Sequence, residues 1–229
     1  MTITRCKNRR LGIVGSLGQV DIISALLIVV IGISLVSAAL LWGLPLIQKN
    51  QSRAIINRVA NDFDRTNTNS LPKKIEEIAN SDEGSFTTFT ISTDGLWVLD
   101  PYDPADPESN SIYFIFNAKE SDIAAGLGWI PNTCGGSAGL VGTDAPIVVC
   151  KRADAIGSDN YNITYKLWFR ERAENFEDPD AKIYKLGLVQ HTSSLPRSTG
   201  KSIRIFRGPI TTDEVNKNLI ITEIKILLE

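Results

Sequence analysis

The sequence predicts an α+β fold in which a long N-terminal hydrophobic helix is followed by an antiparallel β-sandwich head. Between Ile22 and Ile47 no side chain is charged. These 26 residues are long enough, at about 1.5 Å of helical rise per residue, to cross a hydrocarbon layer about 30 Å thick. After Gly84 the apolar residues alternate with polar ones in short segments rich in β-branched and aromatic residues, which is typical of strands.

The helix is expected to continue past its uncharged stretch. Ile55, Val59 and Phe63 recur at helical spacing between charged positions, so a helix kinked at Pro45 is predicted to end near Phe63. The segment "SLPKKIEEIANSD" predicts a short second helix with Ser70 as its N-cap. The chain then divides into a basic leader (1–18), a hydrophobic, kinked helix (19–63), a linker with a short helix (64–83) and a β-rich extracellular head (84–229).

Eight runs of residues in the head are predicted to be strands: 86–92, 96–99, 111–118, 146–153, 161–171, 182–190, 202–207 and 218–228. That many short strands separated by turn-rich segments indicate a sandwich or barrel. In "YNITYKLWFRE" the alternation predicts an antiparallel strand with one buried and one exposed face. A fragment starting near Ser81 is therefore expected to fold alone as a soluble, β-rich monomer.

The uncharged stretch is about twice as long as the apolar region of a secretory signal peptide, so we expect it to be retained. The leader "RCKNRR" is strongly basic, whereas the nearest cations after the stretch are only Lys49 and Arg53. The positive-inside rule then places the N-terminus in the cytoplasm and the head outside.

Composition argues against several other functions. With 24 basic and 26 acidic residues the chain lacks the positive field of a nucleic-acid-binding protein. His191 is its single histidine, and it lies in a loop without the surroundings of a catalytic serine. No phosphate-binding or zinc-protease motif is present. We therefore expect neither enzyme activity nor a cofactor.

The cysteines agree with export. Cys134 and Cys150 lie in the part expected outside, while Cys6 lies in the leader. A disulfide between Cys134 and Cys150 is the natural pairing in an oxidising compartment, and closing such a loop contributes about 3 kcal/mol to stability. Two free buried thiols, or half of a metal site, are the alternatives.

Two further features belong to an exported protein. Asn50 and Asn162 each begin an N-glycosylation acceptor triplet, although Asn50 closely follows the apolar stretch and Asn162 lies within a predicted strand. The turn-rich segment after residue 99 carries four carboxylates that could bind Ca²⁺ or could simply be solvated. These are Asp100, Asp103, Asp106 and Glu108.

A short basic leader ending in glycine, then "GQVDIISALLIVVIGISLVSAALLWG", then a β-rich head resembles the archaeal type IV pilin-like proteins. The resemblance implies a leader that prepilin peptidase removes. Some members begin their mature chain at a glutamine, which indicates cleavage between Gly18 and Gln19. Cleavage between Gly12 and Ile13 is the alternative, because neither glycine follows the lysine or arginine that is usual in the family.

The resemblance also implies a function. The chain would be a structural subunit of a cell-surface filament, a homo-oligomer built by a pilus assembly machinery. The retained helices would form the filament core and the heads its sheath, and the precursor would wait in the cell membrane. A single-span surface protein that binds a ligand without polymerising is the alternative, and an anchored exported enzyme is a third hypothesis.

Asp21 stands at the entrance of the uncharged stretch. At the headgroup boundary a carboxylate does not prevent insertion, and the start of a helix favours negative charge. After cleavage its carboxylate would meet the new α-amino group of a neighbouring subunit, a pairing that is stronger in an apolar core than in water. A solvated interfacial aspartate is the alternative interpretation.

Overall fold

The structure is a computed structural model that describes residues 17–106, 108–132, 134–157, 160–213 and 216–229, with side chains described from residue 22 onward. The chain divides into two compact units, with the boundary between Gln48 and Lys49. The boundary lies inside the first helix. The second unit, Lys49–Glu229, is called the head below.

Helix α1 extends over Leu17–Phe63 and contains Pro45. It ends where the sequence periodicity predicts. We call its residues 22–48 the apolar segment and its residues 49–63 the head segment. The kink predicted at Pro45 stays a prediction.

The head segment of α1 is amphipathic. Its apolar side chains recur at helical spacing, and Ile56, Val59 and Phe63 are buried in the core of the head. The ring of Phe63 stacks against Tyr165 with centroids 4.8 Å apart and against Trp97 with centroids 6.1 Å apart. Aromatic stacking of this kind adds to the free energy of burial. This end of α1 is therefore a core element of the head.

Helix α2 (Leu71–Ala79) also belongs to the core. Ser70 occupies its N-cap position with an extended backbone, as predicted, but its side chain makes no capping hydrogen bond. Leu71, Ile75 and Ile78 are buried in the same core as Phe63. The segment expected to be a linker is thus packed into the head, because one face of its short helix is apolar.

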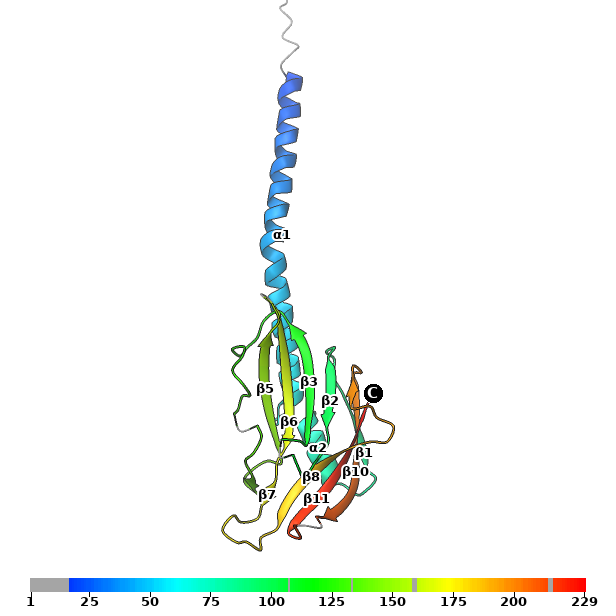
Figure 1. The fold of residues 1–229 in the computed structure, drawn as a ribbon. Helices are drawn as coiled ribbons and strands as arrows, with labels where there is room; N and C mark the ends of the chain where they lie inside the picture. Colours follow the sequence, from blue (N-terminus) through cyan, green and yellow to red (C-terminus); the bar gives the residue numbers. More distant parts are fainter. Residues whose placement is uncertain (1–16, 107, 133, 158–159, 214–215) are drawn as a thin grey trace, which may run out of the picture. The chain divides into compact units, whose positions relative to one another are not determined.

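The strands form two sheets. The six-stranded sheet has the order β1-β10-β11-β8-β7-β4, and the five-stranded sheet has the order β5-β6-β3-β2-β9. Their bounds are β1 Phe86–Thr90, β2 Leu96–Asp100, β3 Ser111–Ala118, β4 Gly139–Leu140, β5 Ile147–Ala155, β6 Tyr161–Phe169, β7 Arg172–Ala173, β8 Ile183–Gln190, β9 Arg197–Ser198, β10 Ser202–Thr212 and β11 Leu219–Leu228. Figure 1 shows β5, β6 and β3 side by side.

The sheets are mostly antiparallel, but two of the pairings are parallel. Strand β11 pairs with β8 in parallel register, with Leu219 opposite Ile183 and Ile226 opposite Gln190, and β4 pairs with β7 in the same sense. A parallel pair needs a long crossover connection. Between β8 and β11 the chain makes this crossover through β9 and β10.

Strand β6 departs from the expectation of one exposed face. Ile163, Leu167 and Phe169 point into the core, as predicted, but Lys166 and Trp168 on the opposite face are also buried. The chain between β3 and β5 covers this face. Its Trp129 packs against this face, with 5.7 Å between the ammonium nitrogen of Lys166 and the ring centroid. This long connection is an outer cover that strand alternation does not reveal.

Asn110 joins the two sheets. Its amide nitrogen donates to the carbonyl oxygens of Phe169 (3.0 Å) and Leu186 (2.8 Å), while its side-chain oxygen accepts from the backbone N–H of Leu188 (2.8 Å). Its φ of 69° is a conformation that asparagine tolerates better than most residues. One buried amide therefore connects β6 with β8.

Candidate functional site

The apolar segment of α1 is the first candidate for a functional surface. It is long and apolar enough to cross a membrane, and no part of the most hydrophobic window is buried. Leu41 and Trp42 have 74% and 84% of their surface exposed. A helix that is apolar on all sides needs lipid or other protein around it. An external cover is therefore required along the whole segment.

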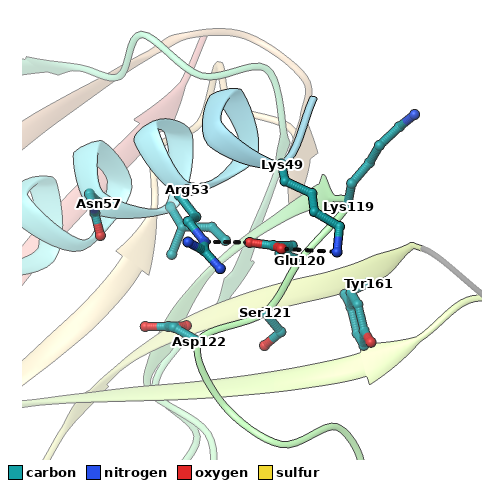
Figure 2. Close-up of a pocket in the computed structure, with 9 residues that line it drawn as sticks. Lys49, Arg53, Asn57, Lys119, Glu120, Ser121, Asp122 and Tyr161 are labelled. Carbon is teal, nitrogen blue, oxygen red and sulfur yellow. Dashed lines mark hydrogen bonds and ion pairs between the residues drawn. The ribbon is translucent and has the colours of Figure 1, made fainter. Parts of the chain in front are cut away.

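The second candidate is a pocket of about 590 Å³ in the head. One wall is the start of the head segment of α1, where Lys49, Arg53 and Asn57 recur every four residues and so lie on one helix face. The other wall is the chain after β3, residues 119–122, together with Tyr161 at the start of β6. Figure 2 shows these side chains around a central Glu120.

Glu120 holds the two walls together. Its carboxylate accepts a hydrogen bond from Arg53 Nε at 2.6 Å and lies 3.6 Å from Lys49 Nζ. The two cations are well exposed, with side-chain exposures of 68% and 58%, whereas Glu120 is at 18%. Ser52 adds a third link, because its hydroxyl accepts the backbone N–H of Lys119 at 3.2 Å. Exposed ion pairs of this kind contribute at most about 1 kcal/mol.

The pocket carries an excess of positive charge. Its lining includes three cations and two carboxylates. Asp122, however, forms an ion pair with Lys151, which does not line this pocket. Glu120 is thus the carboxylate that Lys49 and Arg53 share. Tyr161 also lines the pocket and brings a neutral hydrogen-bonding group close to the cations. The hydroxyl of Ser121, another lining residue, already donates to the carbonyl oxygen of Ile123 at 2.7 Å.

A shallower groove continues from this pocket past Asn57, between the end of α1 and β5. Tyr165 lines it, and its buried hydroxyl has no hydrogen-bond partner among the described residues. Burial and the nearby Asp122 carboxylate raise the pKa of Tyr165. The phenol therefore stays neutral at physiological pH.

The predicted processing and assembly residues lie at the start of α1. Gly18, Gln19 and Asp21 are within the helix, but their side chains lie outside the described part, and so do Gly12 and Ile13. Cleavage and the role of Asp21 stay predictions.

The predicted pairing of the two external cysteines is present. Cys134 and Cys150 form a disulfide with their Cα atoms 6.1 Å apart. Cys150 belongs to β5 and is fully buried. The bond fastens the outer cover to the five-stranded sheet.

The two acceptor asparagines have different surroundings. Asn50 is exposed on α1. Asn162 is partly buried on β6, where it lies between Asn117 of β3 and Asp154 of β5. Alternation places it on the face opposite Ile163, which is in the core. Use of either site stays a prediction.

The acidic loop uses two of its carboxylates in backbone turns. The described residues include no group of three or more histidine, cysteine, aspartate or glutamate side chains that could hold a metal ion. Asp103 and Asp106 instead accept backbone N–H groups two residues ahead, each at 2.9 Å. The charges of Glu108 and Asp100 also act on the ammonium group of Lys166 and oppose the burial that lowers its pKa. The binding of Ca²⁺ by this loop stays a prediction.

His191 lies in the loop after β8, as expected. Its ring stacks on Phe206 with centroids 5.1 Å apart, and its Nδ1 accepts the backbone N–H of Ser193 at 3.2 Å. Both contacts are structural ones.

The pocket around Glu120 was not predicted from the sequence. The four-residue spacing of Lys49, Arg53 and Asn57 marks a polar helix face. No sequence signal brings residues 119–122 to that face, because the contact depends on how the head packs.

Comparison with known proteins identifies no relative: no family model, no curated protein and no solved structure matches this chain.

Proposed function

We propose that this chain is the structural subunit of a cell-surface filament of the archaeal type IV pilus-like kind. The observation that carries the proposal is the apolar segment of α1, which is uncharged from Ile22 to Ile47 and exposed at every position except Gly43. It is joined directly to a head that has its own core. In the filament, copies of this segment pack against one another.

The free energy of burying apolar side chains favours surrounding the apolar segment first with lipid and then with other copies of the chain. Removing a leucine or isoleucine side chain from water contributes about 1.5–3 kcal/mol, so the segment cannot remain in water. Lipid surrounds it in the precursor. Other copies surround it after assembly, when the head lies at the cell surface. This sequence of events requires a prepilin peptidase and an assembly machinery as partners.

The amphipathic head segment supports the proposal in a second way. Ile56, Val59 and Phe63 are buried in the head core, and the large exposed apolar side chains of α1 are confined to residues before Gln48. The chain therefore separates a surface for association from a self-contained head. A filament with an inner layer of helices and an outer layer of heads needs subunits with this separation.

The first experiment shears surface material from the native cells. We expect thin filaments in negative stain, made of a subunit whose mass corresponds to a chain starting at Gln19. A mass corresponding to Ile13 would move the cleavage site and leave the proposal intact. An uncleaved chain found only in the membrane would contradict the proposal and favour the anchored binding protein.

The second experiment tests Asp21. Asp21→Ala should leave the precursor inserted but abolish or greatly reduce shed filaments, since an α-amino group buried without its partner is costly. Asp180→Ala, at an exposed head position, is the matched control and should assemble normally. Immunoblots of the membrane and sheared fractions measure both pools. Equal shedding by the two variants would make Asp21 a solvated boundary residue.

A further inference from the structure

The pocket around Glu120 begins two residues after the uncharged stretch ends. At about 1.5 Å per residue, Lys49 and Arg53 lie roughly 3 and 9 Å beyond Ile47 along the helix. The polar layer on each side of the hydrocarbon is about 5–8 Å thick. In a chain whose α1 crosses a membrane, Lys49 is therefore at the level of the lipid headgroups. The backbone of Arg53 lies at their outer edge, and its long side chain tilts back toward them because helical side chains point toward the N-terminus. The inference rests on this crossing, which the filament subunit and the anchored alternative both require.

We propose that this pocket binds the phosphate of an anionic membrane lipid. A phosphate group is recognised by guanidinium and ammonium groups supported by neutral donors. Arg53 and Lys49 supply the charges from one wall, and Tyr161 lies on the other wall as a neutral hydrogen-bonding residue. A volume of about 590 Å³ is sufficient for a headgroup. The walls come from separate parts of the head, so the pocket exists only in the folded chain.

Glu120 occupies the position between the two cations that a phosphate would take. Its carboxylate lies between the two cations, at 2.6 Å from Arg53 and 3.6 Å from Lys49 (Figure 2). A guanidinium has five donors, so Arg53 can bond Glu120 and a second acceptor at once. Lys49 is held at the longer distance and turns more easily to the lipid. Glu120 is therefore a competitor for the same cations.

Because Glu120 competes with phosphate, replacing the cations and replacing Glu120 should have opposite effects on lipid binding. Replacing both cations removes the attraction for phosphate. Replacing Glu120 with glutamine removes the competing charge and leaves the cations available. If the three side chains served only to hold the walls together, both changes would weaken the same contact, and neither would alter the preference for lipid charge.

The test uses the full chain in detergent micelles doped with equal amounts of phosphatidylglycerol and phosphatidylcholine. Native mass spectrometry counts the lipids retained on the protein. We expect the wild type to retain phosphatidylglycerol in preference. A membrane-surface cation is worth about 1 kcal/mol, so the Lys49→Gln/Arg53→Gln variant should lose this preference about tenfold or more. Glu120→Gln should increase it.

The control removes two cations elsewhere. Lys182 and Lys217 are exposed in the loops before β8 and β11, at the other end of the head from the last residues of β3 (Figure 1). Lys182→Gln/Lys217→Gln should keep the wild-type preference, and circular dichroism should show that every variant is folded. An equal loss in this control, or no change in any variant, would overturn the proposal.

A final arm separates a lipid from a soluble phosphate. Glycerol phosphate at the same concentration as the lipid should not displace phosphatidylglycerol. Displacement would assign the pocket to a free phosphate and overturn the lipid proposal. A strain that sheds filaments while its subunit shows no lipid preference contradicts this inference alone. A subunit that keeps the preference but never forms filaments contradicts the proposed function alone.

Discussion

The two segments of helix α1 have the same secondary structure and opposite surroundings. From residue 22 to 48 the helix is apolar on all sides and exposed, whereas from 49 to 63 it buries one face, including Val59 and Phe63, in the head core. The boundary between the two compact units falls between them. The apolar segment depends on a partner outside the molecule, and the head segment depends on the head itself. Helix continuity therefore does not define a domain.

The largest effect is expected when the head segment of α1 is removed, because the head core depends on it. A fragment of residues 49–229 should be soluble, monomeric and cooperatively folded. A fragment of residues 81–229 should not fold, because it lacks Phe63 of α1 and Leu71 of α2, both fully buried. This differs from the sequence-based expectation that the shorter fragment suffices. Circular dichroism and thermal unfolding of the two fragments measure the difference, and equal cooperativity would place α1 outside the core.

A single substitution sharpens the same contrast. Phe63→Ala removes the ring that stacks on Trp97 and Tyr165 and should lower the free energy of unfolding of the head by about 3–5 kcal/mol. Leu26→Ala, in the apolar segment, is the matched control and should leave head unfolding unchanged. Denaturant titration of the full chain in detergent, followed by near-ultraviolet circular dichroism, compares them. Equal losses would mean that the two segments are not energetically separate.

The disulfide tests whether the outer cover belongs to the head alone. Replacing Cys134 and Cys150 with serine should lower the free energy of unfolding by about 3 kcal/mol, while the helical signal of the apolar segment persists. Cys6→Ser is the control and should change neither. The effect is measured on the oxidised chain under the same titration. A loss confined to the helical signal would contradict the assignment of this bond to the head.

The smallest effects concern two aspartates near the end of α1, whose pKa values shift in opposite directions. Burial raises the pKa of Asp62, an effect that Arg58 partly offsets. Hydrogen bonds from the backbone N–H and the hydroxyl of Thr66 lower the pKa of Asp64. Folding thus disfavours the ionised form of Asp62 and favours the ionised form of Asp64.

Replacing the two aspartates should therefore change the stability of the head in opposite directions. Asp62→Asn should slightly stabilise the 49–229 fragment at pH 7, and the gain should vanish as the pH falls through the raised pKa of Asp62 and the wild-type group becomes neutral. Asp64→Asn should slightly destabilise it above the unfolded-state pKa of about 3.9. That loss should vanish as the pH falls through the lowered pKa. Denaturant unfolding at pH 7 and pH 3 tests both, and changes of the same sign would be inconsistent with this account.

The elements that depend on local pattern were predictable. The uncharged run before Ile47 indicated the helix, and each of the eight predicted strands overlaps an observed one. The two-residue strands β4, β7 and β9 were missed, because alternation cannot be detected in two residues. The parallel pairing of β8 with β11 was also missed, since strand order depends on contacts between distant parts of the chain.

The candidate site shows the same division. The disulfide between Cys134 and Cys150 was predictable, because these are the two cysteines in the part expected to lie in an oxidising compartment. The ion pair between Arg53 and Glu120 joins residues that are far apart in sequence, and no sequence motif predicts it. The buried outer face of β6, with Lys166 beneath Trp129, likewise depends on an irregular connection. Local periodicity indicated the elements, and only packing brought their side chains together.

We propose that copies of the chain cover the apolar segment of α1, and a photo-crosslinker at Leu35, an exposed position in that segment, tests this most directly. Irradiated surface material should yield a ladder of covalent chain multimers, and the Asp21→Ala strain, with its chain still in the membrane, should yield mainly lipid adducts. Lipid adducts without multimers from wild-type cells would contradict the claim, because lipid would then be the lasting cover of the helix.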